Sequence, residues 1–534
     1  MATIKIEQFH GIMPRTHPSL LADGMAVTAH NCRLKSGKLV PLKQPKNVGD
    51  RLIRLENGLG KIADAKSIFV WKRGNEIEFL AYPGRVYMAE GNIADDGYDR
   101  VFMTGDTGMG TNGVEPCVYL FNDSSNNIIR HKIAKDSLPA PRVRLATGGH
   151  SDLDNTRYTY FYQTWVDQYG YESGVSEKEQ TYVRTCRTAT GSGDEYGWTI
   201  TLPIGGDTIT CTKDDLTYSA KIDHCKITLD GTTPVVVEMY SDDDLEYNDG
   251  DSVIINALEE SDVPDGGGTL AAPTAGFKRR IYKVVTGSET ESVQFIAEFS
   301  VDPWGQHTVT VKDEDAGEVL TEMESAPKDL KYMTFVPGGF YVGFSPSQKR
   351  TVMFSEVDIP VDWPLAYRYD IKDKIVGLAV TSNSVFVLTD GFPWIFSGTS
   401  PESMTATHIA GPAACVSERS ICLYKNAVYF ASNIGICTIY NDSDEGTICT
   451  NLTDKVFTKE QWNALNPSSC LMAQYDGALF CFFTKTDGMK CGYVIDLLES
   501  ENSVTTHDEE STCLCTDNAT DTLYFVRDAE SEVE

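Results

Sequence analysis

Short, mainly apolar runs recur along almost the whole chain, interrupted by Gly, Asn and Asp. Residues 384–391, 426–433 and 477–483 are examples, and each is rich in aromatic and β-branched side chains. Such runs are typical of β-strands joined by turns, whereas apolar residues at helical spacing are nearly absent. The best helix candidate is short, residues 458–465, with Thr458 as its cap. The pattern predicts an all-β protein.

The runs occur in pairs, two strands joined by a polar turn, at spacings of about 40–50 residues. Such units lie near the start of the chain, at 67–71 and 77–82, and at its end, around 522–526. Units at both ends of a chain can close a ring, and sheets repeated around a ring are the blades of a β-propeller. A stack of ordinary hairpins in a sandwich is the alternative. We expect a β-propeller-like core.

A different block lies between these units. Residues 157–167 form one long aromatic run, and 278–285 and 293–299 have the composition of strands. This block favours an immunoglobulin-like β-sandwich inserted into the propeller, with a Gly- and Asp-rich tract at about 187–275 as a β-rich insertion within it. The expected division is an N-terminal arm at 1–50, first propeller blades at 51–140, the sandwich at 141–300 and the remaining blades at 301–534.

The chain is strongly acidic, with 46 Lys and Arg against 77 Asp and Glu among its 534 residues, a net charge of −31. So negative a surface repels phosphates, which argues against a protein that grips nucleic acid. It does not argue against a protein that lies close to DNA without holding it.

No apolar run approaches the roughly 18–20 residues that a membrane-spanning helix needs, so we expect no membrane insertion. The first residues lack an apolar signal-peptide region, and we expect the chain to be made in a cytoplasm. Its 14 cysteines are scattered without the paired CxxC spacing of zinc sites. Most are expected to be buried thiols in a reducing compartment.

Two segments have the outline of ligand-binding loops. Residues 108–113 match GxGxxG but lead into a strand-like run, whereas a dinucleotide site needs a helix there, so a loop is favoured. The acidic run 242–249 has oxygens at alternate positions, as a calcium loop does. Counted from Asp244, however, Asp249 stands at the required glycine and Ile255 at the required glutamate. A solvated turn is favoured there, and calcium remains open.

No sequence motif points to catalysis, and we expect neither an enzyme nor a bound cofactor or metal. A glycosidase carboxylate pair is assembled in space, so the sequence alone leaves it open.

The start of the chain is basic and rich in turn residues. One interpretation is a surface arm that completes the first blade; the other is a segment that docks on a neighbouring subunit. Together with two later stretches, 158–176 and 354–435, this arm resembles the tail nozzle proteins of short-tailed bacteriophages, also called tail tubular protein B or tail hub. The arm residues that carry the resemblance are Gly11, Ile12, Met13, Pro14, Ala29, Asn31, Cys32, Leu34, Ser36, Gly37, Leu39 and Pro41.

The resemblance implies a homohexameric ring below the portal and its adaptor protein, in a virion tail assembled in the host cytoplasm. Such a ring lines the channel through which double-stranded DNA leaves, without binding it specifically, and helps to retain packaged DNA. It also implies contacts with tail fibres or a needle. A ring of six acidic chains agrees with this role, because a negative lumen lets DNA slide. The alternative is a solvated acidic surface that keeps the subunits soluble before assembly. The arm residues expected to contact a neighbouring subunit or the adaptor are Pro14, Arg15, Arg33 and Lys35.

Two alternatives remain. The chain could be a tail-tip adhesin or receptor-binding protein, with 187–275 as its recognition loop. Less favoured is a propeller hydrolase of glycans, which requires carboxylates and arginines gathered in the propeller's central cup.

Overall fold

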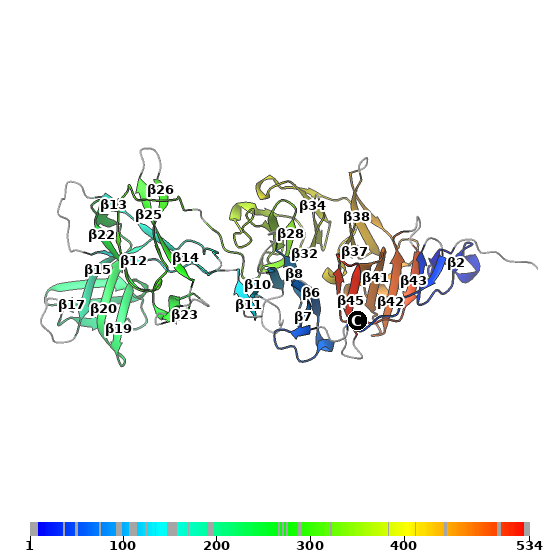
Figure 1. The fold of residues 1–534 in the computed structure, drawn as a ribbon, viewed down its shortest axis with the longest axis horizontal. Helices are drawn as coiled ribbons and strands as arrows, with labels where there is room; N and C mark the ends of the chain where they lie inside the picture. The colour runs from blue at the N-terminus through cyan, green and yellow to red at the C-terminus, as the bar shows by residue number, and fades with distance from the viewer. Residues whose placement is uncertain are drawn as a thin grey trace, which may run out of the picture. The chain divides into compact units, whose positions relative to one another are not determined.

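A computed structural model gives the fold, which is almost entirely β-structure, as the sequence predicts (Figure 1). It divides into two compact units, 1–134 with 326–534, and 135–325, and each is described separately below. The residues that the structure describes are 9–35, 38–48, 52–73, 76–91, 99–105, 115–122, 127–133, 135–146, 157–168, 170–188, 196–264, 268–269, 272–273, 276–286, 291–320, 323–382, 384–411, 413–442, 446–498 and 503–527.

The first unit is a β-propeller. Apart from the strands of the N-terminal arm, its described residues form seven small sheets, each built from neighbouring segments of the chain. In chain order the sheets are β5 (Leu52–Leu55), β6 (Ser67–Arg73) and β7 (Glu76–Tyr82); β8 (Val86–Glu90), β9 (Val101–Gly105), β10 (Cys117–Asn122) and β11 (Asn127–Lys132); β28 (Lys331–Val336), β29 (Phe340–Phe344), β30 (Thr351–Phe354) and β31 (Arg368–Asp370); β32 (Ile375–Val380), β33 (Val385–Thr389), β34 (Trp394–Ser397) and β35 (Thr405–His408); β36 (Cys422–Tyr424), β37 (Ala427–Ala431), β38 (Ile436–Asp442) and β39 (Gly446–Asn451); β40 (Leu471–Tyr475), β41 (Ala478–Thr484), β42 (Lys490–Asp496) and β43 (Ser503–His507); and β44 (Cys513–Asp517) with β45 (Thr522–Val526).

One edge strand of each sheet contacts the corresponding strand of a neighbouring sheet; we call these the inner strands, and they are β6, β8, β28, β32, β36, β40 and β44. Consecutive inner strands pack against one another from β36 through β40, β44, β6, β8 and β28 to β32. The sheets of β32 and β36 share a core that includes Phe386 and Phe430, which closes the circle. The ring is thus continuous, as the units at both ends of the sequence predict.

The two ends of the chain meet where β44 lies beside β6, and Figure 1 shows the blue and red strands side by side. Lys72 Nζ forms an ion pair with Asp517 Oδ1 at 2.7 Å across this junction. The rings of Phe79 and Tyr524 contact edge to face, with centroids 5.0 Å apart. Noncovalent packing therefore closes the propeller between residues that are more than 400 positions apart.

The N-terminal arm extends a sheet of the C-terminal half, which corrects the interpretation that it completes the first blade. Its strands are β1 (Gly11–Ile12), β2 (Met25–Ala26), β3 (Cys32–Lys35) and β4 (Lys38–Pro41). β1 runs parallel to β43 and pairs Gly11 with Val504. Gly11 has φ +87°, and a Cβ there would lie 2.5 Å from the Val504 carbonyl oxygen. Only glycine suits so close an approach at that backbone conformation.

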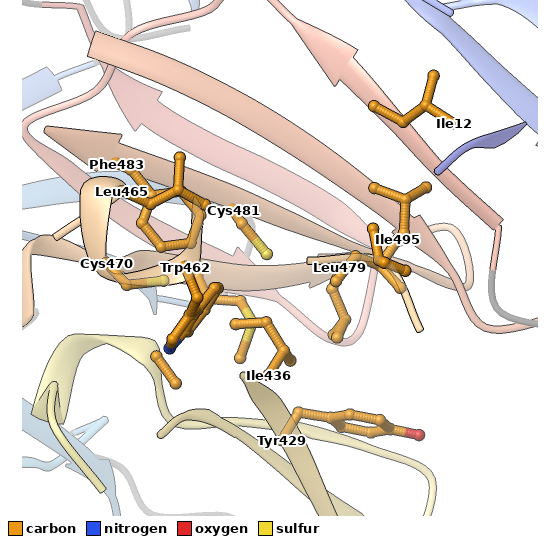
Figure 2. Packing of buried hydrophobic residues seen from close by; sticks show 14 of the residues in the cluster. Ile12, Tyr429, Ile436, Trp462, Leu465, Cys470, Leu479, Cys481, Phe483 and Ile495 are labelled. Carbon is orange, nitrogen blue, oxygen red and sulfur yellow. The ribbon is translucent and has the colours of Figure 1, made fainter. Parts of the chain in front are cut away.

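The predicted helix is confirmed as α1 (Lys459–Ala464), with a capping box between Thr458 and Gln461. It buries Trp462, whose indole N–H donates to the Ser432 carbonyl oxygen at 3.0 Å. Figure 2 shows this indole among the aliphatic, aromatic and thiol side chains between two neighbouring sheets, with Ile12 of the arm packed on the same cluster. The helix thus ties the arm's sheet to the sheet before it.

The second unit is a β-sandwich. Its core lies between a six-stranded and a three-stranded sheet and includes Val143, Phe161, Ile255 and Ile281. In order across the sheets, the strands are β19 (Cys225–Asp230), β20 (Thr233–Ser241), β15 (Gln180–Arg187), β12 (Arg142–Leu145), β22 (Ser252–Ile255) and β27 (His307–Thr310); and β14 (Phe161–Val166), β25 (Lys278–Thr286) and β26 (Glu291–Phe299). Two-stranded pairings are β13 (Arg157–Thr159) with β21 (Leu245–Tyr247), and β23 (Gly268–Thr269) with β24 (Ala272–Pro273).

Two expected boundaries need correction. The sandwich runs to Ser325, not to 300, because β27 pairs with β22 and so belongs to the six-stranded sheet. The tract 187–275 is only partly a separate insertion, since its strands β19, β20 and β22 are members of that same sheet. Within the tract, a further sheet is formed by β16 (Thr199–Thr201), β17 (Thr208–Lys213) and β18 (Leu216–Lys221).

Candidate functional site

The four arm residues that the sequence singles out all contact their own chain. The Pro14 carbonyl oxygen accepts a hydrogen bond from Gln461 Nε2 at 3.0 Å, and Arg15 Nη1 donates to the Asp454 carbonyl oxygen at 2.6 Å. Arg33 and Lys35 both meet Asp476, described next. Their contact with a neighbouring subunit or an adaptor stays a prediction.

Asp476 lies in the turn between β40 and β41, and two arm cations converge on it. Arg33 Nη1 is 2.7 Å and Lys35 Nζ 3.2 Å from its carboxylate oxygens. Partial burial would raise the pKa of Asp476, but these two cations outweigh it and hold the pKa below its usual value. The Arg33 side chain is 6% exposed, so its guanidinium serves to fasten the arm to the propeller.

The segments that resemble ligand loops carry no site in the described part of the chain. Asp244 is bound by Lys178, and Asp243 Oδ2 accepts a hydrogen bond from the Ser241 hydroxyl at 3.0 Å. No group of three or more His, Cys, Asp or Glu side chains among the described residues is arranged to hold a metal ion. Residues 108–113 lie outside the described residues.

The propeller contains a pocket of about 660 Å³ where several inner strands begin. We call it the central pocket. Its wall includes Arg85 just before β8, Lys331 at the start of β28, Ile375 at the start of β32 and Leu471 at the start of β40. Residues 416–419, which precede β36, complete this side. The pocket therefore lies at one mouth of the propeller's centre.

This mouth is cationic, in contrast to the chain as a whole. The charged residues of the wall are Arg85, Lys331, Lys349, Arg419 and the single carboxylate Glu418. Sequence reasoning missed this group because its members are dispersed between positions 85 and 419, and only ring closure gathers them. No local spacing could have revealed it.

Glu418 is held between two of these cations. Arg85 Nη1 lies 2.5 Å from its Oε1, and Lys331 Nζ lies 2.9 Å from its Oε2. Burial would raise the pKa of Glu418, but the charges and hydrogen bonds of Lys331 and Arg85 outweigh it, so the pKa is lowered. Glu418 is therefore ionised at neutral pH and neutralises one of the four positive charges.

Arg419 connects the wall to the ring's closing junction. Its Nη1 donates to the Thr512 carbonyl oxygen at 3.2 Å, just before β44, and its Nη2 donates to the Lys66 carbonyl oxygen, just before β6. Both acceptors are uncharged, and burial lowers the pKa of the guanidinium. Arg419 thus fastens the first and last sheets of the ring while it places a cation in the pocket wall.

A strained backbone position stands beside Lys331. Tyr332 has φ +63°, which for a bulky residue costs about 1–2 kcal/mol, and a bulge interrupts the pairing of β28 with β29 there. Its hydroxyl donates to the Glu418 carbonyl oxygen at 3.2 Å, and its ring lies on Tyr87 with centroids 4.0 Å apart. These contacts hold the bulge, which sets the direction of the adjacent lysine. Backbone strain of this kind is concentrated at functional sites.

The wall is suited to binding negative charge. Glu418 is the one carboxylate among its described residues, whereas a glycosidase needs two. Cys470 lines the pocket, but burial and the neighbouring Cys481 raise its pKa well above the usual value, so the thiol stays protonated. The pocket therefore gives no support to the glycan-hydrolase alternative.

Comparison with known proteins assigns no family. No family model matches the chain, and no curated protein matches it. A protein of unknown function from Bacteroides thetaiotaomicron is 12% identical, with a TM-score of 0.26, over 63% of this chain and 85% of its own. A functionally unknown protein from Desulfotomaculum acetoxidans is 9% identical, with a TM-score of 0.23, over 63% and 90%. The N-terminal domain of Nup159 is 7% identical, with a TM-score of 0.23, over 47% and 85%. Similarities this weak carry no argument about function.

Proposed function

We propose that this chain is a structural protein of a short-tailed phage, the hexameric nozzle or hub of the tail. It would line the DNA-ejection channel below the portal and adaptor, help to retain packaged DNA, and act without an active site. The propeller with an inserted sandwich agrees with the architecture that the resemblance implies. No helix among the described residues is long and apolar enough to cross a membrane.

The observation that carries the proposal is the arm, whose nozzle-like residues have architectural positions. Gly11 allows the close approach of β1 to β43. Asn31 has φ +52°, and its side chain donates to Asp508 Oδ2 at 2.9 Å. The Cys32 carbonyl oxygen accepts from the Thr505 hydroxyl at 2.8 Å. Residues that resemble a structural family are thus used to build the fold, as a structural role requires.

Charge supports the same role. A ring of chains that each carry a net charge of −31 repels the phosphates of DNA, and a channel formed by such a ring lets the duplex pass with little adhesion. The cationic central pocket is small and local, so it leaves this balance unchanged.

The experiment is electron microscopy of the purified protein mixed with the portal–adaptor complex of the same virion. The nozzle proposal predicts rings with sixfold symmetry seated on the adaptor. Particles that carry no added density at the adaptor, or density without sixfold symmetry, would contradict it.

The tail-tip adhesin remains a second candidate because the tract 187–275 exposes apolar side chains. Ile204 is fully exposed, and Leu216 is 52% exposed. Exposed apolar side chains mark contact surfaces where they form a continuous patch. If the isolated protein binds to host cells and Ile204→Ser abolishes that binding, the result would favour the adhesin hypothesis over the nozzle.

A further inference from the structure

The central pocket is lined by an excess of positive charge, whereas the chain as a whole has an excess of negative charge. Four cations and one carboxylate line it, in a chain with 77 acidic and 46 basic residues. Like charges brought together raise the free energy of the fold, and burial of a guanidinium adds a desolvation cost. Arg419 bears that cost without a carboxylate in its hydrogen bonds, since both of its acceptors are backbone carbonyls. Such an arrangement is typical of a site whose countercharge is a ligand.

One anionic group of the protein itself, the carboxylate of Glu418, lies in the pocket wall. One of its oxygens meets Arg85 and the other meets Lys331, so two donors converge on a single planar anion. This pairing neutralises only one of the four positive charges. Arg419 and Lys349 then remain as the cations available to an incoming group.

The size and the remaining wall favour a small molecule over a macromolecule. A volume of about 660 Å³ is within the ordinary range for small-molecule pockets. Apolar side chains of Phe344, Ile375 and Leu471 form part of the wall. They can cover the uncharged body of a ligand while the cations bind its charged end.

We propose that the central pocket binds a small organic molecule with two or more linked phosphate groups, held by Arg419 and Lys349. The excess of positive charge in the wall matches a polyphosphate better than a single carboxylate. Phosphate oxygens also suit the planar donor fork of arginine, and lysine adds a point charge. This inference is independent of the nozzle proposal, since the pocket lies within one chain.

Calorimetric titration at fixed ionic strength without magnesium tests it, with pyrophosphate, inorganic phosphate, citrate and a nucleoside triphosphate as ligands. We expect saturable 1:1 binding of pyrophosphate and of the triphosphate, at least about tenfold tighter than inorganic phosphate. Citrate carries comparable charge on carboxylates and should bind more weakly than pyrophosphate. Tighter binding of citrate would overturn the assignment to phosphate, and no saturable binding of pyrophosphate would overturn the site.

Three variants separate binding at the pocket from general charge effects. Lys349 is exposed, so Lys349→Glu should fold normally and weaken pyrophosphate binding at least about tenfold. Glu418→Gln removes the competing carboxylate and should strengthen binding about fivefold. Lys425→Gln is the matched control, because Lys425 follows β36 at the end opposite the pocket. Equal affinities for all three variants would place the anion elsewhere and refute the proposal.

Discussion

Arg33→Met tests how the arm is fastened to the propeller. Arg33 is 6% exposed and donates to the Asp476 carboxylate at 2.7 Å and to the Asp476 carbonyl oxygen at 2.8 Å. Its Nη2 also lies 3.5 Å from Asp496 Oδ2, in a side chain that is 2% exposed. Removal of one member of a buried ion pair costs about 3–5 kcal/mol because the other charge stays buried. Asp476 is 28% exposed and can regain some water, which puts the expected loss at about 3 kcal/mol.

Lys35→Met is the matched control, because Lys35 meets the same carboxylate but is 48% exposed. Exposed ion pairs contribute about 0–1 kcal/mol, so this variant should lose less than about 1 kcal/mol. Urea unfolding measures both losses, and limited proteolysis within the arm should become faster in Arg33→Met only. Equal losses in the two variants, or a loss below about 1 kcal/mol for Arg33→Met, would refute this view of the arm.

Three further predictions follow from other contacts. Gly377→Ala should destabilise the propeller by about 1–3 kcal/mol in thermal or urea unfolding. The added Cβ would clash with Ile421 and lie 3.0 Å from the Tyr332 ring. Unchanged stability would contradict this packing. Glu418 has a lowered pKa in the folded chain, so its ionised form stabilises the fold above the unfolded pKa of about 4.3, and this stabilisation is lost as pH falls through the folded pKa. Between pH 6 and pH 3 the melting temperature should therefore fall more steeply for the wild type than for Glu418→Gln. Parallel curves would contradict the ion pairs. All 14 cysteines are free and ten are buried, so a thiol reagent should titrate 14 groups in denaturant and at most a few in the native protein; fewer than 14 in denaturant would reveal a disulfide.

Secondary-structure elements that depend on neighbouring residues could be predicted from the sequence. Apolar runs bounded by polar turn residues, such as 426–433, predict strands, and the capping residues around 458–465 predict a helix, because both depend on neighbours in sequence. The ring could also be predicted, since strand pairs occur at both ends of the chain. Its closure then brings β44 beside β6, as observed.

Long-range pairing could not be predicted in this way. The arm joins β43 because Gly11 fits against Val504, a match between two backbones almost 500 positions apart that no periodicity encodes. The sandwich extends past 300 because the short strand β27 finds β22 as its partner. The central pocket has the same origin, since its cations are neighbours only once the ring exists.

The most direct test of the proposed role is the mass of the purified protein in solution, measured by native mass spectrometry or light scattering with and without the virion adaptor. A structural nozzle predicts six copies, either alone or once the adaptor is added. A trimer, or a monomer that the adaptor leaves unchanged, would contradict that role and favour the tail-tip adhesin.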